Sequence, residues 1–314
     1  ALIWKGANKR FDEYGNDKII GTNGFYAMKA HWNEHPDRDE AWAEAERSRI
    51  GEERFRREHE CEFLIFDETL ISSITLADME GVAPVETTGQ VRWFKRPTPG
   101  HTYLVSLDPS MGTGGDYAAI QVFELPTFEQ VGEWHHNQTP MNQQIRILQG
   151  INKHIHDTIM EKDSTATPQI FYSMENNTIG EAALMRVMDI GEENIVGMFL
   201  SEPIRKGHRR KFRRGFNTTA KHKIDACTKF KELVEGGKMK INSQLLISEM
   251  KDFVASGLSY KAKPGQHDDL VSSCLLMTRM MKVLADFDPK IFEKWTDRTS
   301  ELTTPMPIFG NFYG

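Results

Sequence analysis

The chain has 314 residues, of which 39% are hydrophobic and 27% are charged, as in an ordinary folded protein of one large or two modest domains. No apolar stretch approaches the roughly 18 residues that a membrane-spanning helix needs, and the amino terminus lacks a signal-peptide layout. The three cysteines, Cys61, Cys227 and Cys274, lie far apart without metal-site spacing, which favours free thiols in a reducing compartment.

The net charge of −6 is distributed unevenly along the chain. Residues 1–84 hold 11 Lys and Arg against 18 Asp and Glu, whereas residues 85–314 hold 28 against 27. Because residues 85–314 are not acidic overall, they can carry a basic surface. One block of Lys and Arg within them contains no Asp or Glu. Counterion release and bidentate guanidinium contacts would favour phosphate binding there, although a charge run is more often a solvated surface. The cations of this block are Arg205, Lys206, Arg209, Arg210, Lys211, Arg213 and Arg214.

Residues 1–84 are predicted to be mixed and mostly helical. Residues 39–57, rich in Ala, Glu and Arg, indicate an exposed helix or two helices with a break near the glycine. Residues 62–76 favour short extended pieces. Residues 84–100 contain several Pro and Gly and predict a domain boundary, while Trp93 and Phe94 indicate that this linker packs on a neighbouring surface. The predicted divisions are residues 1–84, a linker of 85–100, a main domain of 101–287 and a tail of 288–314.

From residue 101 the hydrophobic pattern alternates clearly between strands and helices. Three strands are predicted at 102–108, 117–125 and 129–136, and the turns between them imply that they are antiparallel. The later elements are predicted in this order: a helix through 141–155, a strand at 169–175, a helix from a capping box of Thr178 and Glu181 through Met188, a strand at 194–200, and helices at 219–235, at 244–255 and from about 267. This order fits an α/β fold of the ribonuclease H type, with a mixed central sheet and helices on both faces.

Acidic residues stand where these predicted elements end or begin. Asp108 and Glu175 close apolar strands, Asp116 follows a glycine-rich turn, and Asp268 and Asp269 open the last apolar helix. Carboxylates at the ends of buried strands are costly unless a cation compensates them, and a hard ion such as Mg²⁺ prefers carboxylate oxygen. Because the fold would bring these acids to one edge of the sheet, we predict a metal-dependent nuclease site.

Most of these acids also have a purely structural alternative. Asp108 could be a turn acid, and Asp116 could cap the hairpin. Asp268 could cap the last helix at its amino end, so that Asp269 would gain from the helix dipole. Glu175 is the hardest to explain in this way, because the strand that it ends is strongly apolar.

The acids lie within a series of motifs at residues 107–110 with 112–117, 129–135, 175–176 and 267–271. Motifs in this order resemble those of large terminase subunits, the genome-packaging motors of tailed phages, with the closest resemblance to contractile-tailed myophages. The resemblance covers about residues 95–285, with a weaker match in 50–80. It implies that Asp108, Glu175 and Asp269 form a metal-binding catalytic triad, that Asp116 is a supporting acid, and that Asp268 lies beside the third ligand.

The family implies a packaging ATPase followed by an endonuclease that uses one or two Mg²⁺ or Mn²⁺ ions to cut concatemeric double-stranded DNA. Because the chain lacks a Gly-x-x-x-x-Gly-Lys-Ser/Thr loop, we expect residues 1–84 to be a remnant of the motor domain, without ATP hydrolysis. The implied partners are DNA, the portal protein, the small terminase subunit and the missing ATPase domain, in the cytoplasm of the host cell.

Two other functions fit the same pattern. A junction resolvase or transposase-like nuclease has the same layout of acids, and a symmetric dimer with a preference for four-way junctions would indicate it. A non-catalytic module that grips DNA for the motor would use the basic block alone. In the nuclease reading, residues 205–214 form a mobile, phosphate-contacting loop beside the acids.

Overall fold

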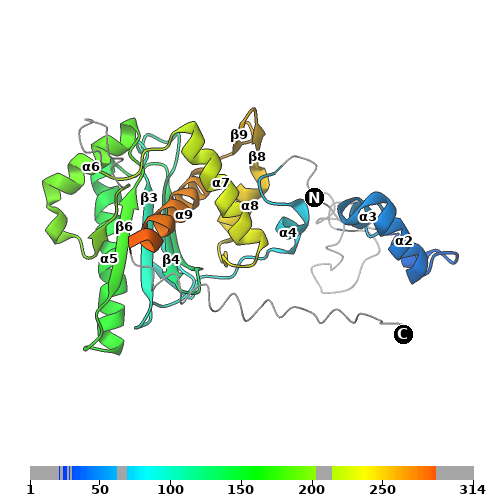
Figure 1. Cartoon of the computed structure of the whole chain (residues 1–314), viewed down its shortest axis with the longest axis horizontal. Helices are drawn as coiled ribbons and strands as arrows, with labels where there is room; N and C mark the ends of the chain where they lie inside the picture. Colours follow the sequence, from blue (N-terminus) through cyan, green and yellow to red (C-terminus); the bar gives the residue numbers. More distant parts are fainter. Residues whose placement is uncertain are drawn as a thin grey trace, which may run out of the picture. The chain divides into compact units, whose positions relative to one another are not determined.

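The computed structural model describes residues 21, 24–26, 28, 30–61, 69–202 and 214–287, which fall into two compact units (Figure 1). One unit comprises Ala1–Phe66 with Ser73–Asp78, and the other comprises Asp67–Ser72 with Met79–Gly314. Within the described ranges no helix has the length and apolar character needed to cross a membrane. The predicted strand pieces at 62–68, the basic residues 205–213 and the tail lie outside the described residues.

The described residues of the first unit form helices. Its elements are η1 (Trp32–Glu34), α2 (Glu40–Ile50), α3 (Glu52–Glu58) and α4 (Ser73–Asp78). Gly51 ends α2 and precedes α3, which confirms the predicted break. The prediction of extended backbone through residue 76 is wrong, because α4 is helical and buries Leu76 completely. Burial of this side chain in a helical turn overrides the weak extended preference of the β-branched Ile74 and Thr75.

The second unit contains a seven-stranded mixed sheet. Its strands are β1 (Glu86–Thr88), β2 (Val91–Trp93), β3 (Thr102–Asp108), β4 (Ala118–Leu125), β5 (Glu129–His136), β6 (Gln169–Met174) and β7 (Met198–Phe199), in the order β1-β2-β5-β4-β3-β6-β7. The pairs β3–β4 and β4–β5 are antiparallel, and β3–β6 and β6–β7 are parallel. The first three predicted strands are therefore confirmed. The strand predicted at 194–200 shrinks to two residues after a 3₁₀ turn, η2 (Glu192–Asn194).

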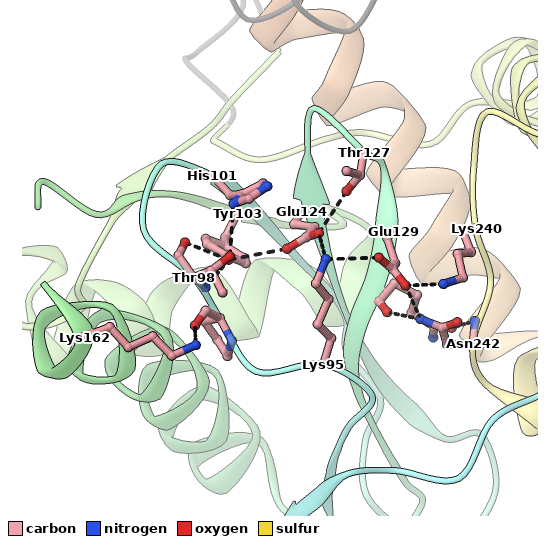
Figure 2. Close-up of polar contacts among 12 residues, drawn as sticks. Lys95, Thr98, His101, Tyr103, Glu124, Thr127, Glu129, Lys162, Lys240 and Asn242 are labelled. Carbon is pink, nitrogen blue, oxygen red and sulfur yellow. Dashed lines mark hydrogen bonds and ion pairs between the residues drawn. The ribbon is translucent and has the colours of Figure 1, made fainter. Parts of the chain in front are cut away.

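The predicted linker contributes two strands to the sheet. Its β2 strand pairs with β5 at Arg92–Glu133 and Trp93–Gly132, and the indole of Trp93 is buried. A Cβ at Gly132 would lie 2.8 Å from this indole, so the close approach requires glycine. Figure 2 shows Lys95, just beyond β2, paired with Glu124 and Glu129 near the turn between β4 and β5. The expectation that this segment packs on a neighbouring surface is confirmed.

Helices cover both faces of the sheet (Figure 1). One face carries α5 (Met141–Lys162) and α6 (Thr178–Ile190), and the other carries α7 (Ala220–Glu235), α8 (Gln244–Asp252) and α9 (Asp269–Phe287). Side chains alternate along β3, so that Val105 joins the core that contains α5 while Ser106 hydrogen-bonds Ser273 of α9, with 2.8 Å between the hydroxyl oxygens. Asp108 shares the face of Ser106 and therefore lies on the α9 side of the sheet.

Two boundaries differ from those predicted. The helix predicted at 244–255 ends at Asp252, because the next residues form a hairpin of β8 (Phe253–Ser256) and β9 (Ser259–Ala262). The capping box at Thr178 is also wrong. Asn177 caps α6 instead, since its side-chain oxygen accepts a hydrogen bond from the backbone N–H of Gly180 at 2.8 Å.

Candidate active site

The three predicted triad acids meet at one edge of the sheet. Asp108 ends β3, and Glu175 follows β6, which runs parallel to β3 with Leu107 opposite Met174. Asp269 is the first residue of α9, which packs across β3 and β4. The carboxyl of Asp108 lies close enough to those of Glu175 and Asp269 for their charges to raise its pKa. The parallel pairing of β3 with β6 and the packing of α9 therefore bring together three acids that lie far apart in the sequence.

The backbone around Glu175 is tightly constrained. Its N–H donates to the carbonyl of Leu107 at 3.2 Å, and it forms a parallel bridge with Phe216. A Cβ at Gly180 would lie 1.8 Å from the carbonyl oxygen of Glu175, so only glycine lets α6 begin this close to the site. These contacts fix Glu175 on rigid elements.

The electrostatics of this edge resist three simultaneous negative charges. Burial raises the pKa of Asp108 well above its ordinary value, and the charges of Glu175 and Asp269 raise it further. Burial also raises the pKa of Asp269 to about 6, although the N–H of Tyr117 opposes that rise. A buried carboxyl beside two others favours protonation or a bound cation.

The supporting acids lie close to the triad. The negative charges of Asp268 and Asp116 both raise the pKa of Asp269. Asp268 accepts a hydrogen bond from the backbone N–H of Ala262 at 3.3 Å, and the ammonium nitrogen of Lys223 lies 3.9 Å from the same carboxylate oxygen. The five predicted acids thus share one electrostatic environment.

The carboxylate oxygens of these residues suit a hard divalent ion, but their side chains are not spaced to hold one. Within the described residues, no three or more His, Cys, Asp or Glu side chains are spaced to hold a metal ion. Several of the carboxylates instead have separate donors, such as the Asn177 amide for Glu175 and the Tyr117 N–H for Asp269. Repulsion between like charges and these separate hydrogen bonds keep the carboxylates apart. The available ligand atoms are nevertheless all oxygens, which Mg²⁺ and Mn²⁺ prefer.

Sequence reasoning missed three residues next to the triad. Glu249 of α8 accepts hydrogen bonds from the N–H groups of Leu270 and Val271 at 2.8 and 3.2 Å, and burial raises its pKa to about 9. The ring of Tyr117 stacks on His135 with 4.1 Å between ring centroids, and burial lowers the pKa of His135 to about 4. The sequence held one indication that Glu249 has a special role. This glutamate lies on the apolar stripe of its helix, beside the buried Leu246, Ile247 and Met250.

The carboxyl-terminal stem of the basic block reaches this site. Arg214, the one predicted DNA-contacting cation within the described ranges, pairs with Glu192, and its carbonyl accepts from the side chain of Asn176 at 2.7 Å. The backbone N–H of Asn176 donates to the carbonyl of Phe216 at 2.7 Å. The described end of the block, Arg214, therefore contacts Asn176, the residue after Glu175.

The raised pKa of Asp269 predicts a pH-dependent stability. Its carboxyl has an ordinary pKa of 3.8 and a folded value of about 6, so its contribution to stability is present below pH 3.8 and is lost as the pH rises through about 6. The Asp269→Asn variant should therefore gain melting temperature over the wild type between pH 4 and 7, measured calorimetrically in EDTA. Asp157→Asn should show the opposite trend, because Lys153 lowers the pKa of Asp157. An Asp269→Asn curve parallel to the wild type would contradict this.

A mixed sheet with three antiparallel strands, a parallel fourth strand and acids from two strand ends and a late helix defines a ribonuclease H-like nuclease. The chain belongs to the terminase RNaseH-like domain family, whose model matches residues 105–280. Residues 105–280 are accordingly the nuclease domain of a terminase large subunit, which cuts DNA during packaging.

Solved structures share this fold. The large terminase nuclease of thermophilic phage G20c with bound magnesium is 17% identical, has a TM-score of 0.50, and is matched over 68% of this chain and 97% of its own. The same nuclease with bound cobalt gives the same four values. A manganese-soaked terminase nuclease domain of human cytomegalovirus is 13% identical, with a TM-score of 0.39 and coverage of 67% and 94%. At 17% identity the likeness to the G20c nuclease concerns the fold alone, and at a TM-score of 0.39 the cytomegalovirus domain carries no argument.

Proposed function

We propose that Asp108, Glu175 and Asp269 are the catalytic metal ligands with which this nuclease domain cuts concatemeric double-stranded DNA, supported by Asp116 and Asp268. The observation that carries the proposal is the half-buried carboxyl of Asp108 at the end of β3, whose pKa is raised by its own burial and by the carboxyls of Glu175, just after β6, and Asp269, on α9. Burying like charges together destabilises a fold, so their placement calls for a cationic ligand.

The proposed cofactor is Mg²⁺ or Mn²⁺, as one ion or two. Divalent ions at such a site supply a nucleophilic water at neutral pH and stabilise the attacking and leaving oxygens of the phosphodiester. The chain itself supplies rigid anchoring. Asp108 and Glu175 are fixed by paired strands, and Asp269 is fixed by the N–H of Tyr117 at 3.3 Å. Support also comes from the magnesium-bound structure of the G20c nuclease, which has the same fold.

The activity is tested by plasmid nicking with and without EDTA. The full chain should nick and then linearise supercoiled plasmid in Mg²⁺ or Mn²⁺, and EDTA should stop the reaction because the acids alone offer no nucleophile. Isothermal titration with each metal in the absence of DNA gives an independent readout of ion binding. Undiminished nicking in EDTA would overturn the metal-dependent assignment.

The wider assembly rests on the sequence resemblance alone. We propose that residues 1–84 end the motor domain without hydrolysing ATP, since the chain has no phosphate-binding loop. The portal protein, the small terminase subunit and the ATPase domain are the proposed protein partners, and the host cytoplasm is the proposed location. The family match favours a terminase nuclease over a resolvase or transposase-like nuclease and over a DNA-gripping module without catalysis.

A further inference from the structure

The first turn of α9, which presents Asp269, is capped from another helix. The opening N–H groups of a helix lack partners within it and are usually bound by the side chain just before the helix. Here both N–H groups, of Leu270 and Val271, donate to one carboxylate oxygen of Glu249 on α8. Asp268, the residue in the usual capping position, bonds the N–H of Ala262 in β9 instead. The cap from α8 thus leaves both Asp268 and Asp269 free of the capping role.

A second chain of contacts joins Glu249 to the carboxylate of Asp269. The other carboxylate oxygen of Glu249 lies 3.6 Å from Nε2 of His135 on β5. His135 stacks on the ring of Tyr117 at an interplanar angle of 17°, and the N–H of Tyr117 donates to Asp269. Both routes from Glu249 therefore end at Asp269, one through the helix backbone and one through two stacked rings.

The position of Glu249 is costly for a carboxylate unless it has this role. Its side chain is 11% exposed, it shares the negative surroundings of Asp268 and Asp269, and an apolar residue would continue the stripe of α8. Removing an acceptor here would leave two buried N–H groups without partners and release the first turn of α9. Residues that hold a metal ligand in place commonly change metal affinity about 10- to 100-fold when substituted.

We propose that Glu249 is a positioning residue that holds Asp269 in place through α9, with His135 supporting Tyr117 from the other side. The proposal rests on the proposed function, because it treats Asp269 as a metal ligand. In this arrangement Glu249 acts as a hydrogen-bond acceptor for two N–H groups. A glutamine retains such an acceptor and should preserve the function, whereas a leucine of similar size should not.

The test compares Glu249→Leu, Glu249→Gln and Glu124→Leu in the full chain. Glu124 is a still more deeply buried carboxylate on β4, bound to Lys95 near the turn between β4 and β5 (Figure 2), so it is a control for the loss of a buried acid away from the site. Calorimetric titration with Mn²⁺ and Mg²⁺ alone gives the metal affinity, nicking at a series of metal concentrations gives the activation constant, and melting curves report folding.

Glu249→Leu should weaken metal binding about tenfold or more and shift the activation constant equally, with part of the rate recovered at high metal. Glu249→Gln should stay near the wild-type affinity, and Glu124→Leu should lose melting temperature without a change in metal affinity. His135→Leu tests the same proposal through the contact with Tyr117. It should weaken metal binding by several fold, even if Glu249→Leu does not fold. A folded Glu249→Leu, or failing that His135→Leu, with wild-type metal affinity overturns the proposal. A Glu249→Gln variant whose metal affinity falls as far as that of Glu249→Leu also overturns the proposal.

The wild type and Asp108→Asn separate this outcome from failure of the proposed function. If the wild type binds neither metal, the assignment of the acids as metal ligands fails. If the wild type binds metal and Asp108→Asn does not, while Glu249→Leu binds as the wild type does, only the positioning role of Glu249 fails.

Discussion

Asp108→Asn is expected to abolish DNA cleavage and at the same time to raise the melting temperature of the metal-free domain. A lost ligand removes several kcal/mol of charge stabilisation from the reaction, which corresponds to a loss on the order of 10³-fold or more in rate. The gain in stability has a different origin. The raised pKa of Asp108 means that ionisation at neutral pH opposes folding, and a neutral amide removes its repulsion with Glu175 and Asp269.

Single-turnover cleavage and calorimetric melting in EDTA at pH 7.5 measure the two effects on one preparation. A stabilisation of about 1 kcal/mol would raise the melting temperature by roughly 2–4 °C in a domain of this size. Asp225→Asn, an exposed acid of α7, should change neither quantity. A stability loss in Asp108→Asn would instead support the alternative of a structural turn acid, and retained cleavage would remove Asp108 from the catalytic set.

The core of the fold was predictable because its strands and helices carry strong local patterns. Strand β3 (Thr102–Asp108) matches its predicted bounds, and Glu175 was recognisable as a carboxylate that closes an apolar run. Their meeting needed one further inference, that the fourth predicted strand lies parallel to the first. The ribonuclease H-type order predicts only that both strands deliver acids to one edge of the sheet, and the parallel pairing of β3 with β6 became visible in the structure.

What the sequence could not predict depends on contacts between distant residues. The short strands β1 and β2 have weak local signals and exist through pairing with each other and with β5. Phe253 and Val254 continue the helical pattern of α8, yet they form a hairpin with β9. The same holds at the site, where His135 and Glu249 are 114 residues apart and 3.6 Å from each other. No local pattern relates a strand histidine to a helix glutamate, so their role became visible only in the structure.

Replacing Arg209, Arg210, Arg213 and Arg214 together with Ala is expected to lower DNA affinity on the order of 10³-fold, if each contributes about 1 kcal/mol through a charge-assisted phosphate contact. The loss should be the same for all sequences, because phosphate contacts carry no base information. Neutralising four contacts should also flatten the dependence of log affinity on log salt by about one unit per contact. Metal affinity should not change, since the proposed ligands lie on β3, β6 and α9.

Fluorescence anisotropy with two duplexes of unrelated sequence, over a range of salt concentrations, measures both affinity and slope. The matched control replaces four exposed cations elsewhere, Arg146, Lys153, Arg186 and Lys229, with Ala and removes the same net charge. If binding depended only on total charge, both quadruple variants would lose affinity equally. The hydrogen bond from Asn176 to the carbonyl of Arg214 places the end of the basic block next to Glu175. Because the scissile phosphate must sit at these carboxylates, we expect a larger loss of affinity for the variant of the basic block than for the control. An unchanged salt slope in the first variant would show that the block is a solvated surface.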